Sequence, residues 1–394
     1  MSNSVPVPFF RPSIGEEEIA EVVATLRSGW LTTGDRARRF EAGIVDYLGG
    51  DVEAVAVNSA TAGLHLALEA LGIGPGDEVV VPDLTFTASA EVVRYLGAEV
   101  RFVDVDPATL CMDPRLLAAA ITDRTRAVMP VHFGGLSCDL DAIAGVVGDK
   151  AIEIVEDAAH ALPTRFRGRL IGTHGTAATV YSFYANKTIT TGEGGMLVTP
   201  RPEIAERARI MRLHGIDRDA FDRFRKPGSG WRYDIVAPGF KYNLSDLAAA
   251  VGVQQLAKTD LFRNQREAIA ERYLDAFAGL PVRLPVRGEQ GGHSWHLFPI
   301  RLLPDAPIDR DAFIAHLAER SIGCSVHYAP LHRMTYWKDR YDLKPEEFPV
   351  SEDVFQSLVT IPLFPAMSER EIDTVITAVR DCLSLKTQPV AAGG

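Results

Sequence analysis

Short apolar runs alternate with helix-like segments through the first half of the chain, and this alternation restricts the fold more than any other feature of the sequence. The runs are rich in Val and Ile, are bounded by turn residues, and lie at Ala54–Val57, Glu78–Val81, Glu99–Val103, Ala127–Val131 and Ile152–Val155. Continuously apolar strands are typical of a parallel sheet that helices cover on both faces. The first half is therefore predicted to be α/β.

The segments around this core show other patterns. Helical spacing of apolar residues, or a long polar stretch, predicts helices over Glu16–Leu26, Arg36–Tyr47, 244–277 and Ser368–Leu383, and a strand is expected over His296–Leu302. The predicted division is an N-terminal arm and large α/β domain over 1–255, then a smaller α+β domain over 256–394. The tail over 390–394 is expected to be disordered.

Composition excludes several classes of partner. The chain has 394 residues, with 41 Lys and Arg against 52 Asp and Glu, so its net charge of -11 is the wrong sign for a nucleic-acid-binding protein. It shows neither the residue order of a signal peptide nor an apolar run long enough to span a membrane, so a cytoplasmic protein is expected. The cysteines are scattered without a CxxC pair, which favours reduced thiols over disulfides or a metal site: Cys111, Cys138, Cys324 and Cys382.

A first candidate site lies where a strand meets a helix. Val55–Val57 is strand-like, the following Asn58–Thr61 is small and polar, and Ala62–Leu71 has helical spacing. Free N–H groups at such a helix start form a natural site for a phosphate group. The alternative is an ordinary serine N-cap.

Two later segments each present one charged residue. Asp157 follows a predicted strand at the edge where ligands of open α/β sheets collect, and two alanines after it leave room for a flat ring. Lys187 lies in SFYANKTITTGEGGM, before the glycine-rich turn 192–195. The alternatives are a helix cap or ion-pair partner for Asp157 and a solvated surface charge for Lys187. Together, a phosphate cradle, a strand-end carboxylate and a lysine match the needs of pyridoxal 5'-phosphate.

These segments belong to a longer series of motifs. The series comprises GWLTTG, NSATAGLHLAL, GDEVVVPDLTFTASA, GAEVRFVDVDP, EDAAHA, SFYANKTITTGEGGM, GFKYNLSDLAAAVGVQQL, WHLFPIRL, SVHYAPLH and IPLFPAMSE. In this order the chain resembles the DegT/DnrJ/EryC1/StrS sugar aminotransferases from about Phe9 to Leu383. The resemblance implies a fold-type I pyridoxal-phosphate transferase, with a mainly parallel seven-stranded sheet in its large domain.

The resemblance also implies roles for individual residues. Lys187 matches the lysine that bonds to the cofactor and later moves a proton, and Asp157 matches the partner of the pyridine nitrogen. The remaining cofactor positions are Ala60, Thr61 and Ser182 at the phosphate, His160 near the phenolic oxygen, and Phe86 against the ring. The alternative for Phe86 is a core phenylalanine.

Further matches concern the partner subunit and the substrate. Asn243 in GFKYNLSD matches a position that reaches the phosphate of a partner subunit, which implies a homodimer with shared sites. Other family members carry GYNYR there, so the identity of the crossing side chain stays open. Substrate contacts are implied for Thr32, Thr33, His327, Tyr328 and His332, and the alternative for His332 is hydrogen bonding within the small domain.

The implied reaction moves an amino group from L-glutamate, through the pyridoxamine 5'-phosphate form of the cofactor, to a nucleotide-linked keto sugar. The forms of GWLTTG and GFKYNLSD favour amination at C4, for surface polysaccharide, lipid or secondary-metabolite amino sugars. The alternatives are a keto-cyclitol or 3-keto-sugar aminotransferase, a pyridoxamine-dependent deoxygenase, in which histidine replaces the lysine, and a non-enzymatic regulatory relative. A nicotinamide dehydrogenase is excluded because the glycines of 72–76 have the wrong spacing.

Overall fold

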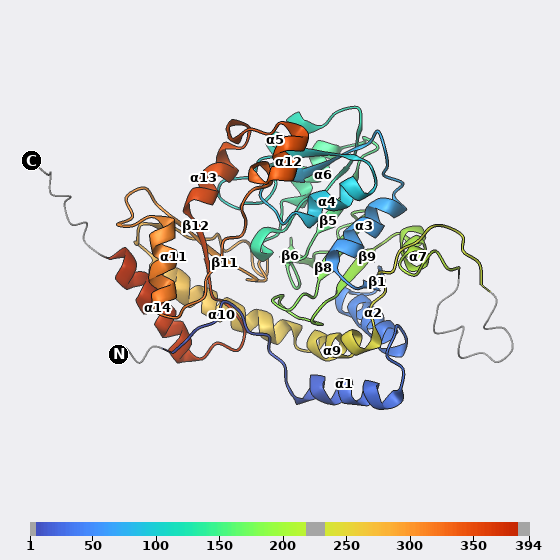
Figure 1. The fold of residues 1–394 in the computed structure, drawn as a ribbon, viewed down its shortest axis with the longest axis horizontal. Coiled ribbons are helices and arrows are strands. Elements are labelled where there is room, and N and C mark those ends of the chain that lie inside the picture. The colour runs from blue at the N-terminus through green and yellow to red at the C-terminus, as the bar shows by residue number, and fades with distance from the viewer. Residues whose placement is uncertain (1–4, 218–232, 385–394) are drawn as a thin grey trace, which may run out of the picture.

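A seven-stranded sheet forms the centre of the structure, a computed structural model that describes residues 5–217 and 233–384 (Figure 1). In spatial order its strands are β1 (Glu53–Val57), β9 (Gly195–Thr199), β8 (Ala178–Ser182), β5 (Glu153–Asp157), β4 (Thr125–Val128), β2 (Glu78–Pro82) and β3 (Glu99–Val103). Strand β9 is antiparallel to both of its neighbours, and the other pairs are parallel. The prediction of a mainly parallel seven-stranded sheet is confirmed.

Helices cover both faces of this sheet, which explains why its strands are continuously apolar. One face packs on α2 (Asp35–Leu48), α5 (Pro114–Ala120) and α6 (Leu140–Val147), and the other packs on α3 (Ala60–Ala70), α4 (Ala88–Tyr95) and α7 (Pro202–Met211). Successive residues of one strand enter opposite cores: Ala56 lies in the first, and Val55 and Val57 lie in the second.

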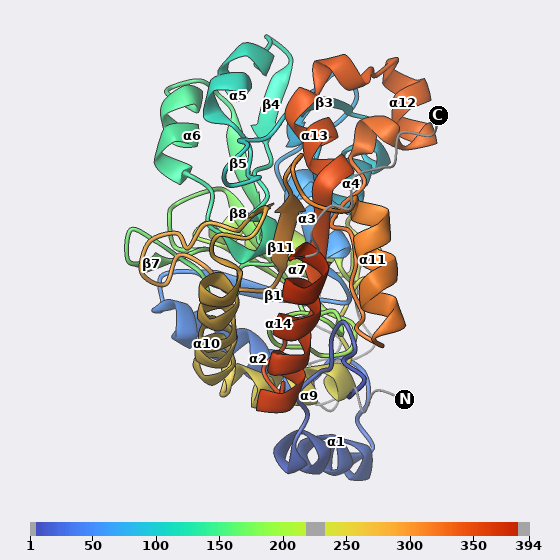
Figure 2. The ribbon, with the colours of Figure 1, turned by 90° about the vertical axis from the view of Figure 1, so that its left-hand side faces the viewer.

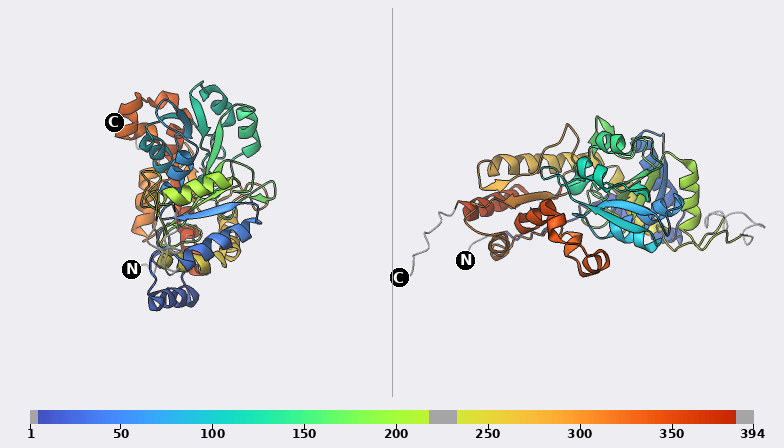
Figure 3. Two further views of the ribbon diagram at one scale, coloured as in Figure 1. Left: turned by 90° about the vertical axis from the view of Figure 1, so that its right-hand side faces the viewer. Right: turned by 90° about the horizontal axis from the view of Figure 1, so that it is seen from above.

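A separate apolar core lies in the C-terminal part of the chain. Its sheet is antiparallel, with β10 (Val282–Arg283), β11 (Phe298–Leu302) and β12 (Leu358–Ile361). Helices α10 (Thr259–Phe277), α11 (Arg310–Glu319) and α14 (Glu369–Leu383) pack around it (Figure 2), at the opposite end of the elongated molecule from α7 (Figures 1 and 3). The smaller α+β unit of the predicted fold class is confirmed, whereas the boundary at residue 256 stays a prediction.

The N-terminal segment joins both parts of the molecule. Val7 exchanges backbone hydrogen bonds with Ser321 and Gly323, and its side chain is buried in the C-terminal core. Helix α1 (Glu16–Ser28) instead lies against α9 (Asp246–Leu256) beneath the large sheet (Figure 1). The chain therefore crosses from one core to the other within its first thirty residues.

One predicted helix is two helices in the structure. The segment 244–277 forms α9 and α10, with a break at Ala257 and Lys258. Gln255 and Lys258 anchor the break, because both side chains bond to Glu18 of α1. Helix α9 thus packs on α1 and α2, while α10 turns away toward α14.

The remaining elements are short. They are a two-stranded hairpin, two helices and three 3-10 turns: β6 (Arg165–Phe166), β7 (Arg169–Leu170), α12 (Thr335–Tyr341), α13 (Pro349–Ser357), η1 (Phe133–Gly135), η2 (Leu331–Arg333) and η3 (Pro345–Glu347). Among the described residues, no helix combines the length and the apolar character that crossing a membrane requires. The predicted disordered tail, 390–394, lies outside the described residues.

Candidate active site

A cavity of about 520 Å³ opens at the carboxyl ends of the parallel strands. Six segments contribute to it: the start of α3, the loops after β2 and β4, the turns after β5 and β8, and a loop of the C-terminal part. Its lining includes Ser59, Ala60, Thr61, Thr85, Phe86, Asp157, His160, Ser182, Tyr184, Asn186, Lys187, Glu193, His327 and Tyr328. Both its position and its size are typical of a cofactor site in an α/β fold.

The start of α3 forms the anion-binding end of this cavity. Ser59 caps the helix, and its Oγ accepts a hydrogen bond of 3.1 Å from the N–H of Ala62. The N–H groups of Ala60 and Thr61 open the helix and have no helical carbonyl to bond to. At Gly195 a Cβ would lie only 2.6 Å from the nitrogen of Ala60, so glycine lets β9 approach this turn closely. The arrangement fits a phosphate group.

Asp157 ends β5 and is held on both carboxylate oxygens. Its Oδ1 accepts a hydrogen bond of 3.0 Å from the N–H of Ala159, and its Oδ2 accepts one of 2.7 Å from Oγ of Ser89. Asp157 is 6% exposed and forms no ion pair within residues 5–217 and 233–384. The carboxylate therefore faces the cavity with its orientation fixed by neutral donors.

Lys187 is placed where its amine can react. The turn after β8 holds it through a hydrogen bond of 2.9 Å from its own N–H to the carbonyl of Tyr184, and the residue lines the cavity. Burial lowers the pKa of its amine to about 8, although the charge of Asp157 opposes this change. Lys187 is half-buried and lines the cavity, so the alternative of a solvated surface lysine is wrong.

Aromatic side chains form one wall of the cavity. Phe86 is 56% exposed, so the alternative of a core phenylalanine is wrong. Its ring centroid lies 5.9 Å from that of Tyr328, whose hydroxyl is 3.1 Å from Nε2 of His160. The N–H of Gly134 donates to Nδ1 of His160, which leaves the imidazole proton on Nε2, facing Tyr328. Burial and the nearby Lys187 hold the pKa of His160 well below its usual range, so the ring is neutral.

Several predicted contacts lie outside the cavity of their own chain. Thr32 is exposed, while Oγ1 of Thr33 donates to the carbonyl of Leu244 and accepts a hydrogen bond of 2.6 Å from Asn243. His327, by contrast, lines the cavity, with Nδ1 at 3.0 Å from Oγ1 of Thr360. Of the predicted substrate residues, only His327 and Tyr328 line it.

His332 requires a correction. It is 1% exposed and does not reach the cavity; its Nδ1 lies 2.7 Å from Oδ2 of Asp83, and its Nε2 lies 3.1 Å from Oε2 of Glu352. The alternative was hydrogen bonding within the small domain, but Asp83 belongs to the loop after β2, so the imidazole links that loop to α13. His332 is therefore a structural residue and is not retained as a substrate contact.

The same contacts predict a pH-dependent stability. Burial alone would lower the pKa of His332, but the facing carboxylates of Asp83 and Glu352 outweigh it and raise the pKa above 6.5. Its stabilising effect is therefore complete below pH 6.5 and is lost as the pH rises through the raised value. We expect His332→Gln to cost about 3 kcal/mol of unfolding free energy at pH 6, and less at pH 9, in urea titrations.

A matched control is His316→Gln. Burial lowers the pKa of His316, so the difference between this variant and the native chain should not shrink as the pH rises. A cost of His332→Gln that is equal at both pH values would contradict the assignment of a charged imidazole.

Sequence reasoning missed several residues of the site. Ser89 and Thr85 lie within the motif that contains Phe86, and Tyr184, Asn186 and Glu193 lie within the lysine motif, but no pattern singled them out. Their positions in those motifs are the only signal that the sequence offers.

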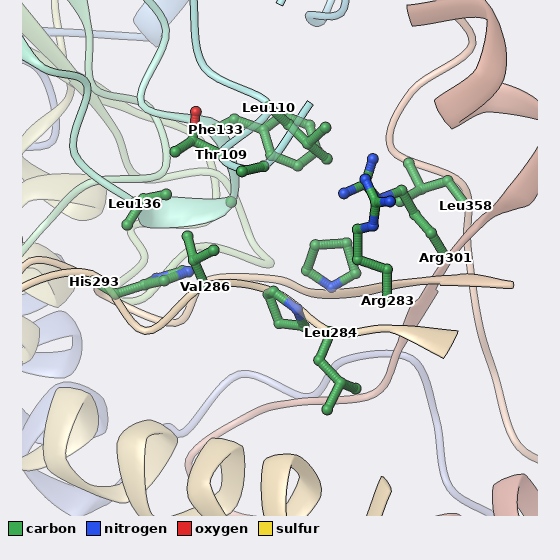
Figure 4. Close-up of a pocket in the computed structure, with 14 residues that line it drawn as sticks. Thr109, Leu110, Phe133, Leu136, Arg283, Leu284, Val286, His293, Arg301 and Leu358 are labelled. Carbon is green, nitrogen blue, oxygen red and sulfur yellow. The ribbon is translucent and has the colours of Figure 1, made fainter. Parts of the chain in front are cut away.

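A second cavity lies between the two parts of the molecule (Figure 4). Arg283 and Arg301, which are paired across β10 and β11, extend into it, opposite Leu110 and Phe133 of the large domain. Its volume of about 20 Å³ is roughly that needed by a single water molecule, so it has no room for a cofactor or a sugar. The cavity at the carboxyl ends of the parallel strands, which has both the room and the polar side chains, is therefore the candidate active site.

The residues of this cavity fit pyridoxal phosphate. Backbone N–H groups at the start of α3 suit the phosphate, and a fixed carboxylate, an amine of lowered pKa and an exposed aromatic ring line the same space.

Comparisons with known proteins agree with this geometry. The DegT/DnrJ/EryC1/StrS aminotransferase family model matches residues 12–380. The spore coat polysaccharide biosynthesis protein SpsC of Bacillus subtilis (strain 168) is 44% identical over 378 residues, which cover 95% of this chain and 96% of that protein. A putative sugar aminotransferase from Streptococcus pneumoniae, Spr1654, solved in its PMP form, has a TM-score of 0.89 and 35% identity, covering 96% of this chain and 99% of that chain. Its PLP form has a TM-score of 0.88.

A more distant structure supports the fold alone. PseC of Helicobacter pylori, an aminotransferase involved in the biosynthesis of pseudoaminic acid, is 24% identical, has a TM-score of 0.88, and covers 96% of this chain and 100% of its own. The motifs, the cavity and the relatives all lead to one assignment: this chain belongs to the DegT/DnrJ/EryC1/StrS family and is an aminotransferase that depends on pyridoxal phosphate.

Proposed function

We propose that this enzyme transfers an amino group from L-glutamate to C4 of a nucleotide-linked keto sugar. The observation that carries the proposal is the pairing, in one cavity, of a lysine of lowered pKa with a fixed carboxylate beside a phosphate cradle. A sugar substrate is supported by two relatives: SpsC is named for spore coat polysaccharide biosynthesis, and Spr1654 is described as a putative sugar aminotransferase. Amino sugars of surface polysaccharides, lipids or secondary metabolites are the expected products.

The residues of the cavity would have separate roles in cofactor binding and proton transfer. Ala60, Thr61 and Ser182 would hold the phosphate of the cofactor, and the cofactor, once bound, supplies an electron sink. Asp157 would face the ring nitrogen, and Phe86 would lie against the ring. Nζ of Lys187 would accept the proton that leaves the substrate carbon and would later donate a proton in turn. A group with a pKa of about 8 can do both near neutral pH.

The presence of Lys187 also separates this proposal from its rivals. The resemblance implies histidine at this position in pyridoxamine-dependent deoxygenases, and the lysine here argues against that reaction. A regulatory relative without activity would have no need to keep Lys187, Asp157 and the phosphate-binding residues together in one cavity. We therefore retain amino transfer as the reaction.

The substrate is tested with a panel of acceptors. With L-glutamate as donor, we expect 2-oxoglutarate to form with nucleotide-linked 4-keto pentoses or hexoses at a kcat/KM at least about tenfold above that for 3-keto sugars or keto-cyclitols. The measurement is 2-oxoglutarate release, with mass spectrometry of the amino sugar. A higher kcat/KM with a 3-keto sugar or a keto-cyclitol would overturn the choice of acceptor in favour of that substrate class. Failure of L-glutamate to react would overturn the choice of donor.

We further propose a homodimer whose subunits share active sites. Thr32, Thr33 and Asn243 do not line the cavity of their own chain. Phe86 and Tyr184, which do line it, are 56% and 45% exposed, as expected of an incomplete site. A second copy would place Asn243 near the phosphate of its partner.

Complementation between two inactive variants tests the sharing. Lys187→Ala removes the amine, and Asn243→Asp would place a negative charge against the phosphate of the partner subunit. Each variant alone should be inactive or nearly so, yet a randomly mixed dimer population should recover about one quarter of native activity, because half of the dimers carry one intact site. Mixing Lys187→Ala with a second inactive variant at the same lysine is the control. Full activity of Asn243→Asp, or no recovery on mixing, would contradict the shared site.

A further inference from the structure

A buried chain of hydroxyl groups reaches Asp157 from the loop after β2. Oγ of Ser89 lies 2.7 Å from Oδ2 of Asp157, and Oγ1 of Thr85 lies 3.0 Å from Oγ of Ser89. Ser89 and Thr85 are 0% and 1% exposed, so solvent does not compete for these contacts. The chain is thus a fixed part of the protein interior.

The direction of these hydrogen bonds follows from which atoms can donate a proton and which can only accept one. An ionised carboxylate only accepts, so Ser89 must give its one proton to Asp157. Oγ of Ser89 then has only lone pairs left for Thr85, and Thr85 therefore donates to it. Both hydroxyl dipoles therefore point toward the carboxylate.

The carboxylate is consequently held at two points. The N–H of Ala159 fixes Oδ1, and Ser89 fixes Oδ2. Ser89 itself lies in the first turn of α4, and its N–H bonds to the carbonyl of Phe86 at 3.3 Å. One short segment therefore both presents the aromatic ring at the cavity wall and orients the carboxylate behind it.

We propose that Ser89 is a positioning residue, which turns the carboxylate of Asp157 toward the ring nitrogen of the cofactor, with Thr85 supporting it. The inference rests on the proposed role of Asp157. Without Ser89 one carboxylate oxygen loses its donor, and the group can rotate away from the ring. A hydrogen bond to a charged group is involved, so the loss should weaken cofactor binding by roughly tenfold or more.

Ser89→Ala tests the inference through cofactor affinity. We expect the dissociation constant of pyridoxal phosphate, measured from the cofactor that the holoenzyme retains in equilibrium dialysis, to rise about tenfold. Ser351→Ala is the matched control: Ser351 is equally buried, and its Oγ donates to Oδ1 of Asp104 at 2.6 Å, away from the cavity. It should lower thermal stability as Ser89→Ala does, but leave cofactor affinity unchanged. Equal affinities for Ser89→Ala and the native enzyme would overturn the proposal.

A double-mutant cycle shows whether Ser89 acts through Asp157. If it does, Ser89→Ala should have little further effect on cofactor affinity in the Asp157→Asn background. Independent, additive effects of the two substitutions would overturn the inference while leaving the role of Asp157 intact. An Asp157→Asn variant with native affinity and native activity would instead refute the proposed role of Asp157 itself, so the two failures are distinguishable.

Discussion

Lys187→Ala and Lys187→Arg are expected to abolish turnover. Proton transfer by a positioned side chain contributes about 10²–10⁴-fold to a rate, and alanine removes the group entirely. Arginine keeps the positive charge, but its guanidinium does not release a proton in the working pH range. Neither variant can bond covalently to the cofactor, so the yellow absorption of the lysine-linked cofactor should also be lost.

Stopped-flow absorbance with L-glutamate, together with steady-state assays, measures both effects. Lys338→Ala serves as the control, because Lys338 is an exposed residue of α12 and should leave rate and spectrum unchanged. Cofactor should still bind to the Lys187 variants, since the phosphate cradle is intact. Transamination at the native rate in either variant would refute the assignment of the base.

Asp157→Asn should produce the second large loss. Asparagine keeps the volume of the side chain but removes the negative charge that would face the ring nitrogen. The loss of a charge-assisted hydrogen bond predicts a fall in kcat/KM of about 100-fold. Asp157→Glu, which keeps the charge, should retain more activity than Asp157→Asn.

The same substitution should also move the pH profile. The charge of Asp157 raises the pKa of Lys187, against the larger lowering by burial that brings it to about 8. Removal of this anion destabilises the ammonium form, so the pKa of the amine should fall below 8. The limb of the rate profile that reports Lys187 should therefore shift to lower pH. An unchanged limb, with unchanged kcat/KM, would contradict the proximity of these two groups.

The sequence was informative where a feature depends on neighbouring residues. The parallel sheet was predictable because continuous Val and Ile runs are a local sign of burial on two faces, as in β2 (Glu78–Pro82). The meeting of Asp157 and Lys187 was predictable because both follow sheet strands that end at the same edge. In each case a short segment and the rules of parallel sheets suffice.

Features that depend on distant contacts were not predictable. At the break after α9, Gln255 and Lys258 bond to Glu18, more than 200 residues earlier in the chain. His332 lies in a motif that predicted substrate contacts, yet its imidazole is buried and bonds to Asp83. Periodicity within one segment carries no information about such partners.

The pairing of Val7 beside Ser321 and Gly323 has a consequence for how the protein is made. Residue 7 leaves the ribosome early, but its place beside Ser321 does not exist until more than three hundred further residues have been translated. Val7 therefore cannot take its place in the C-terminal core until that part of the chain has been synthesised. A nascent chain stalled before Ile322 would carry an undocked leading segment, although the whole large sheet had already been synthesised.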